Sequence, residues 1–167
     1  MANITLKGNP IHTNGNLPSV GAKAPDFLLV DADLKDRSLK DYGSKRKLIS
    51  IVPSLDTAVC SLSTKKFNEQ IKSHPGVIAL VVSADSPFAQ KRVCSAENAL
   101  NIISLSMMRS KDFARDYGVL IESGPLAGFC ARAVVVLDEN DKVVYTELVP
   151  EIAQEPDYDK ALAALFK

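Results

Sequence analysis

The three cysteines, Cys60, Cys94 and Cys130, are the side chains of this 167-residue sequence best suited to nucleophilic chemistry. A cysteine reacts as its thiolate, and a free thiol with a pKa of about 8.5 is only slightly ionised near neutral pH. A reactive cysteine therefore needs neighbours that stabilise negative charge on sulfur. An odd, low number of cysteines does not fit a secreted disulfide scaffold, so each is either a reactive thiol or a small buried hydrophobic residue.

Cys60 has the most informative surroundings. It lies about one turn into a segment of helical periodicity that starts near Thr57, where unpaired amides and the helix dipole favour an anion. Arg132 begins an apolar stretch, where an unpartnered charge would be costly, and its guanidinium stays ionised at any working pH. The Thr57 hydroxyl can reach the space beside the Cys60 sulfur, and Pro53 can shield that sulfur from water.

Each of these four residues also has an ordinary structural explanation. Thr57 could be only a helix N-cap, and Pro53 could be only a strand terminator. Arg132 could be a surface charge at a strand edge, and Cys60 could be a packing residue. The ordered combination is harder to obtain by accident than any one of its members.

The segment Pro53-Ser-Leu-Asp-Thr57-Ala-Val-Cys60 resembles the peroxiredoxin pattern Pro-x-x-x-Thr-x-x-Cys, and it is most similar to the bacterial thiol peroxidase branch. The resemblance extends over nearly the whole chain. The other stretches that carry it are Gly8-Asn-Pro10, Lys45-Arg-Lys47, Lys66-Phe-Asn68, Ser83-Ala-Asp85, Pro87-Phe-Ala-Gln90, Gly124-Pro-Leu126, Ala131-Arg-Ala-Val-Val-Val136, Asp138-Glu-Asn-Asp141 and Glu155-Pro-Asp-Tyr158.

This resemblance implies a role for each site residue. Cys60 would reduce hydrogen peroxide or an organic hydroperoxide and become a sulfenic acid, which Cys94 would resolve as an intramolecular disulfide. Thr57 would orient the peroxide, Arg132 would stabilise the thiolate, and Pro53 would shield it. The resemblance further implies thioredoxin as the reductant and a homodimer, and no cofactor or metal is expected.

The two other cysteines are interpreted differently. Cys94 taken alone could be a buried helix residue, and only the resemblance favours a resolving role. A disulfide needs Cα atoms within about 7 Å, so we expect the helix turns around Cys60 and Cys94 to rearrange on oxidation. Cys130 matches no cysteine of the family and is interpreted as structural.

The elements that must position these residues follow from periodicity. The expected strands cover 27–30, 47–52, 77–82, 102–105, 132–137 and 143–147, and the expected helices cover about 57–73, from 86, 110–117 and from 157. A hairpin at 3–13 with its turn at 7–10 and a helical turn at 38–42 are also expected. This order predicts an α/β protein with a central mixed β-sheet flanked by helices and an N-terminal β-hairpin, as in the thioredoxin-like fold, in one domain spanning 1–167.

The overall composition narrows the class of partner. The 20 basic residues balance the 20 acidic ones, so the sequence predicts neither a nucleic-acid groove nor a polybasic membrane face. No apolar run approaches the roughly 18 residues that span a bilayer. The N-terminal residues lack the basic and apolar regions of an export signal, so a cytoplasmic location is expected.

Other thiol-dependent functions fit less well. A disulfide reductase of this fold would carry Cys-x-x-Cys, but Ser63 stands where the second cysteine would be. A copper site or a cysteine protease would need a histidine beside the thiol, and His12 and His74 are expected in surface turns. A redox sensor that forms the same disulfide without sustained turnover remains open, because it shares the first chemical step.

Overall fold

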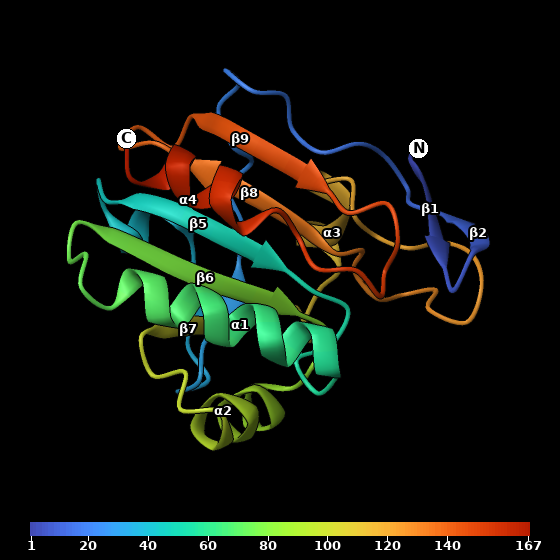
Figure 1. Ribbon diagram of the computed structural model, residues 1–167, viewed down its shortest axis with the longest axis horizontal. Helices are drawn as coiled ribbons and strands as arrows, with labels where there is room; N and C mark the ends of the chain where they lie inside the picture. The colour runs from blue at the N-terminus through green and yellow to red at the C-terminus, as the bar shows by residue number, and fades with distance from the viewer.

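The structure is a computed structural model that describes residues 1–167, and its centre is a seven-stranded mixed sheet (Figure 1). The strands are β3 (Leu29–Val30), β4 (Asp36–Arg37), β5 (Arg46–Ile51), β6 (Val77–Ser83), β7 (Ile102–Ser106), β8 (Ala133–Leu137) and β9 (Val143–Leu148). They lie in the order β4-β3-β7-β6-β5-β8-β9. Strands β5, β6 and β7 are parallel, whereas β8 and β9 continue the sheet in antiparallel fashion. The expected mixed sheet is thus confirmed.

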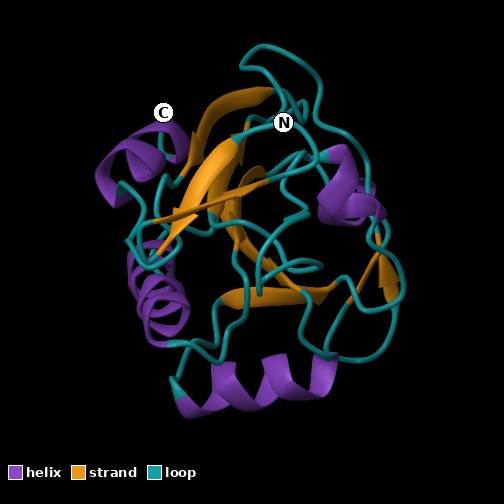
Figure 2. Cartoon of the chain, turned by 90° about the vertical axis from the view of Figure 1, so that its right-hand side faces the viewer, coloured by secondary structure: helices purple, strands orange, loops and turns teal.

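Helices cover both faces of this sheet. They are α1 (Ala58–Ile71), α2 (Pro87–Ala96), α3 (Asp112–Asp116) and α4 (Tyr158–Leu165), with the 3-10 turn η1 (Leu39–Tyr42) between β4 and β5. Helices α1 and α4 lie together against one face, and α3 lies on the other (Figure 2). None of the helices combines the length and apolar character needed to cross a membrane.

The core follows from the apolar runs. Leu48 of β5 points to the α1 and α4 side, where it clusters with Phe67 of α1 and Leu165 of α4, all fully buried. Ile49 and Ile51 belong to the larger cluster on the opposite face. Successive residues of a strand point to opposite faces, so a strand covered on both sides is apolar throughout.

The strand directions gather the cysteine-bearing helices at one edge. Helix α1 follows β5, and α2 follows β6. Because β5 and β6 are parallel, their carboxyl ends lie at the same edge, and both helices begin there. Strand β8 is antiparallel to β5, so β8 begins at that same edge. Three segments distant in sequence therefore meet at one place.

The N-terminal hairpin is confirmed with a shorter turn than expected. Strands β1 (Asn3–Leu6) and β2 (Asn9–His12) pair antiparallel around Lys7 and Gly8. Both turn residues have positive φ, 50° and 79°, as a two-residue hairpin turn requires. The carboxylate of Glu151, which follows β9, accepts hydrogen bonds from both turn amides and from the Thr5 hydroxyl.

Two other elements are shorter than the sequence predicts. Of the strand expected at 27–30, only Leu29–Val30 pairs in the sheet. The helix expected at 110–117 is α3, which covers Asp112–Asp116 and ends before Gly118. Gly118 has a φ of 68°, and a Cβ there would fall 2.1 Å from the Asn16 carbonyl oxygen. Only glycine fits this helix end.

Candidate active site

Cys60 is the third residue of α1, and its side chain has no exposed surface. The residue before the helix, Thr57, has an extended backbone, and the first helical hydrogen bond runs from the Ser61 amide to the Thr57 carbonyl. The amides of residues 58–60 therefore have no helical partner of their own. The sulfur thus lies in the first turn of a helix, where negative charge is favoured.

Arg132 supplies the nearest positive charge. Its Nη1 lies 3.2 Å from the Cys60 Sγ, and only 3% of the residue is exposed. Its Nε donates to the carbonyl oxygen of Ile152 at 2.8 Å, which fixes the plane of the guanidinium. Arg132 forms no salt bridge with a carboxylate. A thiolate at Cys60 is therefore the anion available to balance this buried charge.

The sheet register explains how the arginine reaches the sulfur. Ile51 at the end of β5 pairs with Ala133 at the start of β8. Arg132 immediately precedes Ala133, and Val52 and Pro53 immediately follow Ile51, so this pairing brings the arginine close to the start of the loop that leads into α1. The sequence predicted that this strand begins at Arg132. In the structure β8 begins at Ala133, and Arg132 lies immediately before it.

Thr57 and Pro53 lie on the loop between β5 and α1. The Thr57 hydroxyl donates to the Ser54 carbonyl at 3.0 Å and makes no capping hydrogen bond to the helix amides. The explanation of Thr57 as a side-chain cap therefore fails, although Thr57 does occupy the N-cap position. Thr57 is exposed and Pro53 is buried. A solvent-facing hydroxyl and a buried ring thus lie on the loop before Cys60.

Cys94 shares an apolar cluster with Cys60. Both thiols are free, and both pack with Val52, Leu55 and Val81 between the ends of α1 and α2. Burial raises the pKa of the Cys94 thiol. A cavity of about 320 Å³ separates the first turn of α1 from α2; its lining residues are Leu55, Asp56, Thr57, Ala58, Ser61, Arg92, Val93, Ala96 and Glu97. This open space gives both helix turns room to move.

Cys130 lies apart from this cluster. Its side chain is fully buried, its Sγ is 3.4 Å from the Met107 Sδ, and burial raises its pKa to about 12. A thiol with such a pKa is protonated at neutral pH and unreactive. These features agree with the structural interpretation of Cys130.

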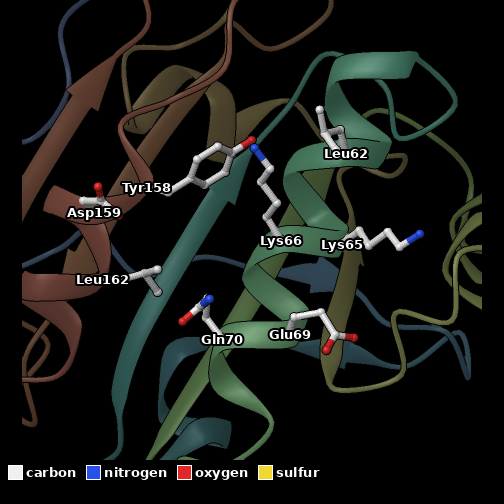
Figure 3. Close-up of a pocket in the computed structure, with 8 residues that line it drawn as sticks. All are labelled: Leu62, Lys65, Lys66, Glu69, Gln70, Tyr158, Asp159 and Leu162. Carbon is white, nitrogen blue, oxygen red and sulfur yellow. The ribbon is translucent and has the colours of Figure 1, made fainter.

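A larger groove lies elsewhere on the molecule. It has a volume of about 600 Å³ and separates the outer face of α1 from α4, as Figure 3 shows. Lys66 lies 4.7 Å from the centre of the Tyr158 ring and pairs with Glu155. No cysteine lines this groove. The contact between Arg132 and the Cys60 sulfur lies outside this groove.

Two groups at the site had no role in the sequence interpretation. The Ile152 carbonyl orients Arg132, but a backbone atom carries no sequence signal. Asp85 binds the loop before α1 through the Ser54 hydroxyl and the Leu55 amide. Its position in Ser83-Ala-Asp85, a stretch that supports the family resemblance, was the available signal.

Comparison with known proteins identifies the family of this chain. Residues 19–162 match the Redoxin family. A thiol peroxidase of Leptospira interrogans serovar copenhageni is 51% identical over 98% of this chain and 97% of that protein. A peroxiredoxin-like protein from Aquifex aeolicus has a TM-score of 0.92 at 43% identity, covering 99% of this chain and 96% of that one. A thiol peroxidase from Chromobacterium violaceum has a TM-score of 0.90 at 28% identity, covering 98% and 95%.

This chain belongs to the Redoxin family, with the thioredoxin-like α/β fold of the peroxiredoxin superfamily. Within that superfamily it falls in the bacterial thiol peroxidase branch, and it is a peroxidase enzyme.

Proposed function

We propose that this enzyme reduces hydroperoxides with Cys60 as the attacking thiolate. The observation that carries the proposal is the contact of 3.2 Å between the Arg132 guanidinium and the Cys60 sulfur, with both groups buried. The thiolate attacks the terminal peroxide oxygen, an S–O bond forms, and the O–O bond breaks. The departing alkoxide or hydroxide takes up a proton, so the products are Cys60 sulfenic acid and an alcohol or water.

Thr57 and Pro53 have supporting roles in this proposal. The Thr57 hydroxyl can turn from the Ser54 carbonyl toward an incoming peroxide and hold its oxygens in line with the sulfur. Arg132 also stabilises charge that develops on the leaving oxygen. Pro53 keeps bulk water from the thiolate and has no backbone N–H to satisfy.

The second step joins Cys60 to Cys94. The Cys94 sulfur attacks the sulfenic sulfur, an S–S bond forms, and water leaves with the thiol proton. The raised pKa of buried Cys94 makes this thiol a poor nucleophile in the reduced structure. We therefore expect the first turn of α1 or the last turn of α2 to unwind, which exposes Cys94 and closes the distance.

The third step regenerates both thiols. An external dithiol donates two electrons and two protons and leaves as a disulfide. We propose thioredoxin as that dithiol and a reducing compartment such as the cytoplasm as the setting. We propose that residues 1–167 form one domain and that the enzyme works as a homodimer. Hydrogen peroxide and organic hydroperoxides are the proposed substrates.

A coupled assay tests these steps. Peroxide consumption is followed with thioredoxin and its reductase, using hydrogen peroxide and an alkyl hydroperoxide. We expect Cys60→Ser to abolish consumption, Cys94→Ser to oxidise once without cycling, and Cys130→Ser to behave as the wild type. Normal cycling by Cys94→Ser would disprove the resolving role. A wild type that stops after one equivalent would favour the sensor alternative.

A further inference from the structure

The carboxylate of Asp85 gathers three hydrogen-bond donors at the end of β6. The Ser54 hydroxyl donates to it at 2.7 Å, the Leu55 amide at 2.8 Å and the Ser83 hydroxyl at 2.6 Å. Asp85 forms no salt bridge with a cation. Its carboxylate therefore joins the last residue of β6 to the loop that leads into α1, and two of the three donors belong to that loop.

Ser54 connects Asp85 to the next residues of the loop through hydrogen bonds. While its hydroxyl donates to Asp85, the same oxygen accepts from the Asp56 amide at 3.2 Å. Its carbonyl accepts the Thr57 hydroxyl at 3.0 Å. One carboxylate thus holds Ser54, whose hydroxyl and carbonyl in turn bind the next residues of the loop, directly before the turn that holds Cys60.

The same network reaches the helix that carries Cys94. The Ser83 hydroxyl accepts from Gln90 Nε2 at 2.9 Å, and that nitrogen also donates to the Leu105 carbonyl at 2.9 Å. Gln90 is fully buried in α2, one helical turn before Cys94. The start of α2 is therefore held against β6 and β7, while the loop before α1 is attached to this fixed body through Asp85.

We propose that Asp85 is a positioning residue that keeps the 54–57 loop closed over Cys60 and must release it before Cys60 can reach Cys94. This inference rests on the proposed function, because it concerns the step between sulfenic acid and disulfide. The closed loop favours reaction of Cys60 with peroxide, whereas the open loop favours resolution. Asp85 thereby sets how often the sulfenic acid meets a second peroxide before it is resolved.

That competition has two outcomes from one intermediate. Reaction of the sulfenic acid with Cys94 forms the disulfide and water, whereas reaction with a second hydroperoxide forms the sulfinic acid and an alcohol or water. The ratio of the two products counts only molecules that have already reacted. A fraction of unfolded or inactive enzyme therefore leaves the ratio unchanged, which separates a positioning role from a general loss of structure.

The test compares Asp85→Asn with the wild type over a series of hydrogen peroxide concentrations. Samples are quenched by alkylation, and intact mass separates disulfide from sulfinic acid. Asp85→Asn should weaken the closed loop by about one net hydrogen bond. The hydrogen peroxide concentration at which the two products form in equal amounts should then rise about fivefold. Ser54→Ala leaves Asp85 in place but removes the hydroxyl bond to Asp85 and the bond that the same oxygen accepts from the Asp56 amide, so it should shift this concentration in the same direction.

Asp138→Asn is the matched control, because Asp138 accepts from two backbone amides in the β8–β9 turn, at 2.8 and 2.9 Å, away from the cysteines. It should leave the product ratio unchanged. If the wild type is active and Asp85→Asn and Ser54→Ala both give the wild-type ratio of products, the inference is overturned and the proposed function stands. A wild type that forms neither product would overturn both. If Asp85→Asn fails to fold, Ser54→Ala decides.

Discussion

Replacing Arg132 with glutamine removes the charge beside Cys60 while keeping a donor for the Ile152 carbonyl. In the wild type, Nη1 and Sγ are 3.2 Å apart and both residues are buried. Two unit charges at that distance attract by about 5 kcal/mol at an effective dielectric of 20, before the cost of burying them is subtracted. Measured values for hydrogen bonds to charged groups are smaller, about 1.5–3 kcal/mol.

That smaller range predicts the kinetic effect. We expect Arg132→Gln to slow the reaction of Cys60 with hydrogen peroxide at pH 7 by roughly ten- to a hundredfold. The measurement is the second-order rate of thiol loss under peroxide excess, taken as a function of pH.

Arg92→Gln is the control for the general effect of removing one positive charge near the site. Arg92 lines the cavity at the start of α1, but it makes no contact with the sulfur and is exposed to solvent. An exposed charge is screened, so this variant should stay within about twofold of the wild type. If the pH–rate profile of Arg132→Gln superposes on that of the wild type, the guanidinium does not stabilise the thiolate and the reasoning is refuted.

Two further predictions concern Thr57 and Glu151. Thr57→Val should slow peroxide attack by about tenfold while Thr57→Ser restores it, measured as thiol loss in single-turnover reactions; equal rates for both variants would contradict the orienting role. The Thr5 hydroxyl and the amides of the hairpin turn lower the pKa of Glu151 from 4.5 to about 2. A lowered pKa contributes stability above pH 4.5 that is lost as the pH falls toward 2, so the melting temperature of Glu151→Gln should depend less on pH in this window. If the melting temperatures of the variant and the wild type change equally with pH, Glu151 makes no such contribution.

The contiguous part of the site could be predicted from the sequence. Pro53, Thr57 and Cys60 follow one another within a strand end, a loop and a first helical turn, so local patterns place them correctly. The order of helices and strands along the chain and the N-terminal hairpin were also predicted, because periodicity and turn residues act over short distances. Boundaries were predicted less well: the turn at Lys7 and Gly8 is tighter than expected, since two positive φ angles shorten it.

The long-range part of the site depended on the tertiary structure. The sequence predicted Cys60 as the nucleophile and predicted a helix start at that residue. That Arg132 meets this sulfur follows from β8 lying antiparallel beside β5, and sheet order is a property of the whole chain. The Ile152 carbonyl and Asp85 joined the site for the same reason, because hydrogen bonds between distant segments form only when the packed sheet brings those segments to one edge.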